Sequence, residues 1–479
     1  MKFTSTRDTA VSASSAEAVI SGISKDGGLF VPKELPSLDY KKMLELDYTA
    51  RADTVLRAFF DFDTDGIADG AYASFDDGEP APVIKLDDKL FVLELWHGRA
   101  CASKDIALSV LPKILASAKK SAGDNTKTLM LVATSGDTGK AAIEGFKDVP
   151  GTEVIVFYPT GGVSELQKLS LSAQDGDNVC AVGVSGSLDE VRKAVKSALT
   201  GGELIAALKE KAVTLSSAGS YNVGSLVPQI AYYFSAYCDL VDSGEIKAGE
   251  KIDFSVPTNF GDILAGYYAY KMGLPVNKII CASDKNSVLA DFIETGVYDA
   301  NDEPNKTESV LVSGNYERFL FETCGRDAEV VRNRLNELNK TGRYKVTPKE
   351  IEEIRTVFAC GYADKDDCAD AVEEMFDEYG YLAGPRTAAA YAVAAERGFP
   401  RPTVVLSTVS PFKSAPEILK ALGEKTKGAV AKETLEELSE ISATEVPERL
   451  IELFGKEKRF TDIIEKEGVA AFIRNRFGV

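Results

Sequence analysis

The sequence predicts an α/β protein built around mostly parallel β-sheets. From about residue 80, short apolar runs alternate with longer amphipathic segments. The runs have the length of buried strands, and the segments between them are long enough for helices. This alternation is typical of βαβ units, in which helices cover a parallel sheet. The chain has 479 residues, which is enough for about three domains.

The elements can be placed in chain order. Ser14–Gly22 has the pattern of a capped helix, and a turn at 26–28 leads into the apolar run 29–31. Residues 106–120 place their apolar side chains on one helical face. Further strands are expected at 90–95, 128–133, 154–158, 253–256, 279–282 and 404–406, a further helix at 140–147, and a charged helical segment broken by Pro447 near the C-terminus.

The composition excludes several classes of protein. There are 55 Lys and Arg against 74 Asp and Glu, a net charge of −19, so the basic surface of a nucleic-acid or anionic-membrane binder is missing. Seven cysteines without a CxxC pair and a single histidine, His97, disfavour a disulfide framework, a zinc site and serine-protease chemistry. No signal peptide or apolar run long enough to cross a membrane is found. We therefore expect a cytoplasmic protein without a metal site.

One candidate for covalent chemistry is Lys104, which lies where a predicted strand ends and a helix begins. Burial at such a junction disfavours the charged form of an amine, and this makes a lysine usable as a nucleophile toward an aldehyde. Because lysines are common on surfaces, the pattern alone favours an ordinary surface lysine.

Three other junctions have polar residues after a strand. The loops 134–139 and 257–262 each contain glycine and precede a helix, so their backbone N–H groups could bind a carboxylate or a phosphate. An ordinary βα turn explains either loop equally well. At the fourth junction, Thr408 follows the strand 404–406, and by itself this indicates only the end of a strand.

An acidic turn resembles the start of a calcium-binding loop. Asp61, Asp63, Asp65 and Gly66 have the right spacing, but the twelfth position is Tyr72 where the loop needs a glutamate. The pattern therefore favours a solvated turn. The sequence also lacks the glycine fingerprints of dinucleotide-binding and P-loop proteins.

Taken together and in order, these segments resemble threonine synthase, a fold type II enzyme that depends on pyridoxal 5′-phosphate (PLP). The resemblance covers most of the chain. It rests on 5–7 and 26–32 at the N-terminus, Glu94–Gly98 with Lys104 and Asp105, Thr134–Gly139, Asn259–Asp262, and Ser407–Thr408 with Pro411 and Lys413.

The chain departs from the family pattern at several positions. No glycine stands between Thr258 and Asn259, Gly219 and Ser225 replace the asparagine and arginine of one motif, and the stretch around Thr307–Val310 is shortened. Arg99 and Arg386 stand where the family has uncharged residues. Since each anion of a substrate needs a cationic or fork-like donor, these two arginines are candidates to replace the missing one.

The resemblance implies a fold like that of the tryptophan synthase β-subunit, with PLP between two α/β domains. The expected division is an N-terminal threonine synthase domain at 1–80, the catalytic region at 81–425 and a helical segment at 426–479. The implied site has Lys104 bound to PLP; a cofactor cradle of Thr258, Asn259, Phe260, Gly261 and Asp262; Thr408 at the pyridine nitrogen; and Ser135, Gly136, Asp137, Thr138, Arg99 and Arg386 at the substrate.

The implied activity is a step of threonine biosynthesis, the conversion of O-phosphohomoserine and water to threonine and phosphate by a monomer or homodimer. Two alternatives stay open. One is a PLP-dependent lyase or replacement enzyme for another amino acid, which the changes at Gly219, Ser225 and Arg386 favour. The other is a binding protein on the same scaffold without catalysis, which the lost glycine favours.

Overall fold

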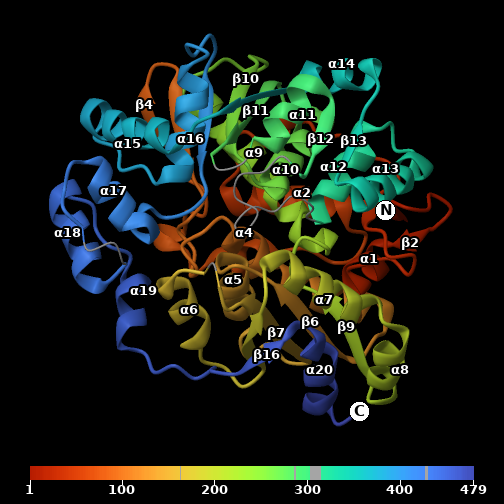
Figure 1. Cartoon of the computed structure of the whole chain (residues 1–479). Helices are drawn as coiled ribbons and strands as arrows, with labels where there is room; N and C mark the ends of the chain where they lie inside the picture. Colours follow the sequence, from red (N-terminus) through yellow and green to blue (C-terminus); the bar gives the residue numbers. More distant parts are fainter. Residues whose placement is uncertain (162, 285–286, 302–313, 427–429) are drawn as a thin grey trace.

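Two parallel β-sheets, each covered by helices, form the body of the chain (Figure 1). The computed structural model describes residues 1–161, 163–284, 287–301, 314–426 and 430–479. The six-stranded sheet has the order β14-β11-β10-β15-β5-β4, in which only β4 runs antiparallel to its neighbour. Its strands are β4 Val83–Asp87, β5 Leu90–Glu94, β10 Ile252–Pro257, β11 Val276–Ser283, β14 Phe358–Tyr362 and β15 Thr403–Ser407.

The five-stranded sheet has the order β16-β8-β7-β6-β9 and is parallel throughout. Its strands are β6 Lys127–Ala133, β7 Thr152–Pro159, β8 Val179–Ser185, β9 Val213–Ser217 and β16 Ile463–Glu465. Two small antiparallel sheets lie beside the body: β1 Lys2–Ser5, β2 Ala13–Ser14 and β3 Phe30–Pro32 form one, and β12 Val297–Asp299 and β13 Arg343–Lys345 form the other.

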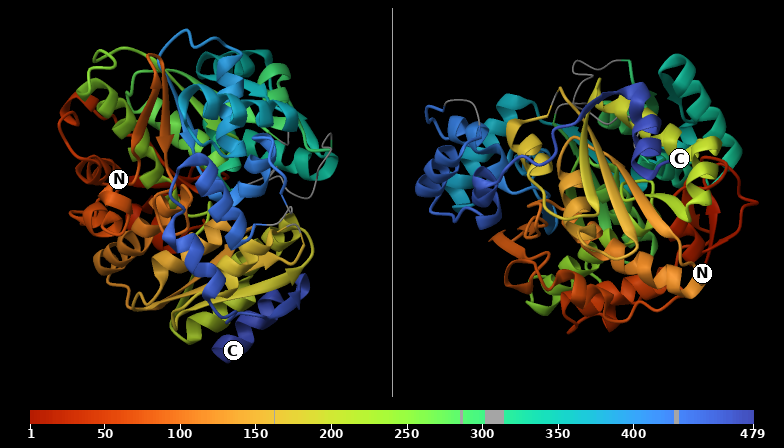
Figure 2. Two further views of the ribbon diagram at one scale, coloured as in Figure 1. Left: turned by 90° about the vertical axis from the view of Figure 1, so that its left-hand side faces the viewer. Right: turned by 90° about the horizontal axis from the view of Figure 1, so that it is seen from below.

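Helices cover both faces of the two large sheets (Figure 2). They are α1 Ser15–Ser21, α2 Tyr48–Phe59, α3 Ile67–Tyr72, α4 Lys104–Ala122, α5 Asp137–Phe146, α6 Glu165–Ser172, α7 Leu188–Thr200, α8 Gly202–Glu210, α9 Val227–Asp242, α10 Phe260–Lys271, α11 Val288–Thr295, α12 Gly314–Thr323, α13 Ala328–Thr341, α14 Pro348–Val357, α15 Lys365–Tyr379, α16 Pro385–Ala395, α17 Ala415–Ala421, α18 Lys432–Ser442, α19 Glu448–Ile451 and α20 Val469–Phe477. None of those described is long and apolar enough to cross a membrane.

The predicted α/β class is confirmed, and the alternation of side chains along each strand explains the layers. In β5, Phe91 and Leu93 enter the central core, whereas Leu90 and Val92 face a second core under α15 to α17. Strand β6 likewise divides its side chains between the central core and a third core under α7, α8 and α20. Strands buried on both faces read as continuous apolar runs, which is why the sequence located them.

The chain does not build its two large sheets one after the other. Strands β4 and β5 belong to the six-stranded sheet, residues 127–217 then form four strands of the other sheet, and β10 returns to the first. The expected boundaries near residues 80 and 425 stay a prediction.

The C-terminal segment differs from the helical prediction. It contains strand β16, which pairs in parallel with the edge strand β8. Figure 1 shows the segment passing from α18 and α19, beside the six-stranded sheet, to β16 and α20 on the five-stranded one. Helicity was the wrong prediction at 463–465 because three residues carry too little pattern, and only the ladder with β8 makes them a strand.

The acidic turn that resembles a calcium loop has other partners for its carboxylates. Asp61 accepts hydrogen bonds from Ser15 and the Met1 ammonium group, and Asp65 pairs with Arg57. In the described part of the chain, no group of three or more His, Cys, Asp or Glu side chains is arranged to hold a metal ion.

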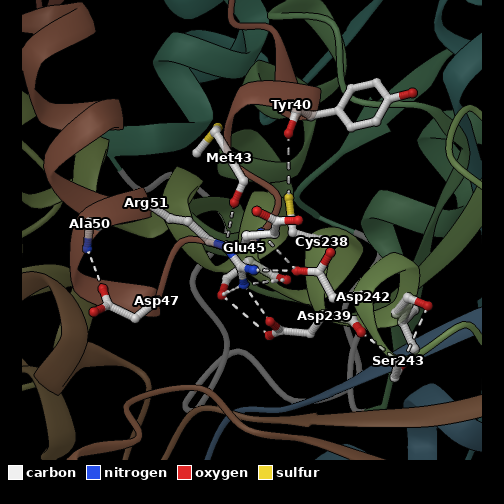
Figure 3. Close-up of polar contacts among 12 residues, drawn as sticks. Tyr40, Met43, Glu45, Asp47, Ala50, Arg51, Cys238, Asp239, Asp242 and Ser243 are labelled. Carbon is white, nitrogen blue, oxygen red and sulfur yellow. Dashed lines mark hydrogen bonds and ion pairs between the residues drawn. The ribbon is translucent and has the colours of Figure 1, made fainter.

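A buried arginine ties the N-terminal region to the rest of the chain (Figure 3). Arg51 on α2 is 3% exposed, and its guanidinium group donates to the Met43 carbonyl and the Ser235 hydroxyl, both at 3.0 Å. It also pairs with Asp239 and Asp242 on α9. Acceptors from four residues therefore hold the Arg51 side chain between α2 and α9.

We expect Arg51→Met to lower the free energy of unfolding by about 1.5–3 kcal/mol, because charge-assisted hydrogen bonds are lost and two carboxylates keep no cation. Urea unfolding measures the change. Arg57→Met on the same helix is the matched control: its pair with Asp65 is 58% and 78% exposed, so the change should stay within about 0.5 kcal/mol. Equal losses for the two variants would contradict the prediction.

Candidate functional site

Lys104 meets the start of α10 although the two are far apart in sequence. Its Nζ lies 3.3 Å from Oδ1 of Asp262, and the lysine side chain is 19% exposed. Asp262 is fully buried, and the Tyr232 hydroxyl donates to the same Oδ1 at 3.0 Å. The other oxygen, Oδ2, has no hydrogen-bond partner among the described residues. The structure thus brings Lys104 and the 258–262 segment together.

The turn that precedes Lys104 is held by the residue that follows it. The Asp105 carboxylate accepts hydrogen bonds from the N–H of Ala100, at 2.8 and 3.0 Å, and from that of Ala102 at 3.3 Å. A Cβ at Gly98 would lie 2.3 Å from the Asp105 Cβ, so only glycine fits there. Burial raises the pKa of Asp105 to about 6, against the effect of these hydrogen bonds.

The start of α10 is surrounded by polar side-chain groups that converge on Gly261. Asn259 caps the helix by accepting from the Gly261 N–H at 3.0 Å. A Cβ at Gly261 would meet Gln229 Oε1 at 3.1 Å and Asn315 Nδ2 at 3.3 Å. A glycine, a helix N-terminus and converging amide groups together suit a small anion.

The side chains of the two residues on either side of Asn259 have partners of their own. The Thr258 N–H and hydroxyl both donate to the Ala282 carbonyl at 2.8 Å. The Phe260 ring packs on Tyr316 and Phe319 in the core. The Phe260 ring thus belongs to the core and the Thr258 hydroxyl is bound to the backbone, while the predicted roles of both residues at the cofactor stay untested.

The loop 134–139 leads into α5 and lies near the turn that precedes Lys104. The Thr134 hydroxyl accepts from the N–H groups of Gly136 and Gly139 at 3.0 and 3.3 Å. Asp137 Oδ1 lies 2.6 Å from Lys413 Nζ, and Lys413 also donates to the Ala100 carbonyl. Lys413 therefore links the loop of one sheet to the segment that follows β15 in the other.

A cavity of about 760 Å³ opens between α5 and α6 on one side and α15 to α17 on the other. Ser135 and Asp137 line it, and so do both predicted arginines, Arg99 and Arg386. Further cations on its wall are Lys140, Lys365, Lys413, Lys420 and Arg449. Two arginines that lie far apart in the sequence thus line one cavity, and their predicted role in substrate binding stays untested.

The two arginines differ in whether a carboxylate lies near them. Arg99 is 57% exposed and lies 3.7 Å from Glu144. Arg386 is exposed at the start of α16, and no described residue forms an ion pair with it. Arg386 is therefore the freer of the two to bind an anion.

The predicted site residues fall into two groups with a shared wall. Lys104 and 258–262 do not line the cavity. The wall between the groups consists of the turn 98–103 and the segment after β15: the Ser103 N–H donates to the Thr408 carbonyl at 2.8 Å, and the Ser410 N–H to the Cys101 carbonyl at 3.1 Å. Thr408 is buried in this wall next to the turn that carries Lys104.

Some positions that depart from the family pattern can be located. Ser225 is buried, and its hydroxyl donates to the Ala218 carbonyl at 3.3 Å, so it does not reach the cavity. Gly219 donates its N–H to the Ser217 hydroxyl within the same loop. The shortened stretch at Thr307–Val310 lies outside the described residues.

The sequence analysis missed Tyr232, Gln229 and Asn315. Each belongs to a helix whose local pattern is that of an ordinary packed helix, and only its contact with Asp262 or Gly261 brings it to the site. No sequence signal marks these residues.

Comparison with known proteins gives a consistent result. The family model for the threonine synthase N terminus matches residues 2–72. Threonine synthase from Pseudomonas aeruginosa is 31% identical, over 96% of this chain and 95% of its own. Threonine synthase-like 1 from Homo sapiens is 36% identical over 85% of this chain, which spans only 58% of that protein.

Among solved structures, the PLP-bound threonine synthase from Brucella melitensis has a TM-score of 0.85 and 30% identity, with both chains covered completely. The similarity therefore includes the whole fold described above.

We expect the free energy of unfolding to fall as the pH rises from about 4 to about 6, in part because of Asp105. The unfolded chain releases this proton near 3.8, whereas the folded chain keeps it to about 6. The folded state thus binds more protons in this window, and Asp105→Asn should flatten the pH dependence by about 1 kcal/mol per pH unit. Urea unfolding between pH 4 and pH 6 measures the slope.

Asp124→Asn is the control for this series. Burial opposes the shift, but hydrogen bonds from Thr126 lower the pKa of Asp124 below 3.8, so it ionises below the window and its loss should leave the slope unchanged. An unchanged slope for Asp105→Asn as well would show that Asp105 ionises normally.

Proposed function

Since this chain belongs to the threonine synthase family, we propose that it is a lyase that uses PLP to convert O-phosphohomoserine and water to threonine and phosphate. The observation that carries the proposal is the position of Lys104 beside Asp262 at the open start of α10. The match to the family extends over the full length of the bacterial relatives.

The residues at this point fit PLP. A primary amine stands 3.3 Å from a buried carboxylate whose second oxygen has no partner among the described residues. Next to them, polar atoms of Gln229, Asn259 and Asn315 converge on the helix N-terminus, at 3.1–3.3 Å from the Cβ position of Gly261. An aldehyde needs the amine, and a phosphate needs the N-terminus, so both ends of the cofactor have a complementary group.

When bound, PLP supplies an electron sink that stabilises negative charge on the substrate carbons during proton removal. Lys104 would hold the cofactor through its Nζ and, once released, would carry protons at the α and β carbons of the substrate. Asp262 orients this amine. Thr408, a hydroxyl and not a carboxylate, would face the pyridine nitrogen.

The cavity on the other side of the shared wall from Lys104 has groups that suit a substrate with two anionic groups. The N–H groups of Ser135, Asp137 and Thr138 would bind the α-carboxylate at the start of α5, whereas the Gly136 N–H already donates to the Thr134 hydroxyl. Lys413 neutralises the Asp137 carboxylate, which would otherwise repel that group. Arg386, with Arg99 as a second candidate, would bind the phosphate.

A second candidate function is a PLP-dependent lyase for another amino acid. It is favoured by Ser225, which bonds within its own loop where the family has an arginine. The identity of 36% with threonine synthase-like 1, of which the chain spans only 58%, also leaves the substrate open.

Phosphate release distinguishes the two. The purified protein with PLP should develop a visible absorption band and release phosphate from O-phosphohomoserine together with threonine. A visible absorption band without phosphate release from O-phosphohomoserine would favour a PLP-dependent lyase for another amino acid. No band with added PLP would contradict both and favour a binding protein without catalysis.

We expect Lys104→Ala to abolish the visible band that borohydride reduction fixes to the wild-type protein, because no other amine lies beside Asp262 in the described part of the chain. Mass spectrometry of the reduced protein locates the label. Lys113→Ala, an exposed lysine on the same helix α4, should keep both band and label. A label on another lysine would overturn the assignment.

We expect Arg386→Ala to raise KM for O-phosphohomoserine by roughly tenfold to a hundredfold, because a charge-assisted hydrogen bond contributes about 1.5–3 kcal/mol. Arg99→Ala should have a smaller effect, since Glu144 already pairs with Arg99. Lys420→Ala, which removes a cation from the same cavity wall, is the control. Equal kinetics for wild type and Arg386→Ala would exclude Arg386 from the phosphate subsite.

A further inference from the structure

A fully buried arginine without a carboxylate partner lies close to the start of α10. Arg318 on α12 is 0% exposed. It donates to the carbonyls of Phe30 at 3.0 Å, Ser220 at 2.6 Å and Tyr221 at 2.7 Å, and to Asn315 Oδ1 at 2.7 Å. Burial lowers its pKa to about 10, so the group stays charged at neutral pH. No described carboxylate lies within ion-pair distance of it.

Such a charge is costly to bury. A guanidinium group satisfied only by neutral oxygens keeps its charge uncompensated in an interior of low dielectric constant. An anion bound nearby would compensate it. The nearest place for one is the start of α10, because Asn315 joins Arg318 to Gly261.

Arg318 also fixes which way the Asn315 amide points. Since Oδ1 accepts from Arg318, the amide nitrogen Nδ2 must face the other way, and it lies 3.3 Å from the Cβ position of Gly261. Asn315 is 4% exposed, and its Nδ2 makes no hydrogen bond to another described residue. Nδ2 is not one of the fully enclosed side-chain atoms without a partner, so it faces space that a bound acceptor can reach.

The surroundings decide the charge of that acceptor. The N-terminus of α10, a helix of 12 residues, favours an anion. Asp262, the acidic residue in its first turn, is already paired with Lys104. Gln229 Oε1, an acceptor without a described partner, lies 3.1 Å from the Gly261 Cβ position. Its partial negative charge repels an anion, so the anion is expected on the side of Asn315.

We propose that Asn315 is an anion-binding residue at the start of α10, that its Nδ2 donates to the phosphate group of the cofactor, and that Arg318 is the positioning residue that orients the amide. This inference rests on PLP as the cofactor under the proposed function. It adds a donor from α12, a helix that supplies none of the residues expected from the sequence.

The test compares PLP with pyridoxal, which has the same ring and aldehyde but no phosphate. Asn315→Asp keeps an oxygen for Arg318 and replaces the donor by a second oxygen. Titration of the apoprotein, followed by absorbance and by the fluorescence of the single tryptophan Trp96, should show at least tenfold weaker PLP binding for the variant. The affinity for pyridoxal should change less than twofold.

Two controls separate binding from folding. Asn336→Asp makes the same substitution on the exposed side of α13 and should leave both affinities unchanged. Inorganic phosphate, which probes the phosphate end alone, should raise the melting temperature of the wild-type apoprotein and not that of Asn315→Asp. Far-UV circular dichroism checks that the variants are folded.

Arg318→Met tests the positioning role. It should reduce the preference for PLP over pyridoxal as Asn315→Asp does, and the double variant should show no further reduction. If Arg318→Met does not fold, Asn315→Asp alone still decides the binding role.

The outcomes that overturn the inference differ from those that overturn the proposed function. Unchanged PLP affinity of Asn315→Asp, or an equal loss for PLP and pyridoxal, would overturn this inference alone. A wild-type protein that binds neither compound would overturn the cofactor assignment and this inference with it.

Discussion

The close contact between α4 and α5 is the constraint on which the site depends. Pro112 lies inside α4 and has no N–H for the Leu108 carbonyl, which stays open toward α5. Gly145 of α5 packs directly on that carbonyl: a Cβ there would lie 2.1 Å from the oxygen. Because α4 begins at Lys104 and α5 at Asp137, this contact sets the separation between the predicted cofactor lysine and the predicted carboxylate loop.

The distribution of charge matters more than its sum. The chain carries a net charge of −19, yet the cavity wall is rich in cations, and Arg318 lies without a described carboxylate partner beside α10. The same wall also holds Asp137, Asp284, Asp364, Asp366 and Glu417, and Lys140 and Lys413 pair with carboxylates, so the local arrangement of charges and not their sum decides what the cavity can bind. An overall acidic composition is therefore compatible with a site for phosphate and carboxylate groups.

Much of the fold could be predicted because its signals are local. The helix expected at 106–120 spans Lys104–Ala122, and the strands expected at 90–95 and 128–133 are β5 and β6. Glycine-containing loops at the ends of strands indicated where anions could bind. By contrast, the strand β16 and the pairing of Lys413 with Asp137 depend on partners far away in the sequence.

The sequence by itself determined the α/β class, the family and the residues at the strand ends, since each follows from periodicity or from a short motif. Only the tertiary structure decided which of them share a wall, that Arg99 and Arg386 line one cavity, and that the Thr258 hydroxyl donates to Ala282 while the Phe260 ring packs on Tyr316. It also decided the positions of Asn315 and Arg318. The physical reason is that hydrogen bonds and burial act between neighbours in space, and a sequence pattern records only neighbours along the chain.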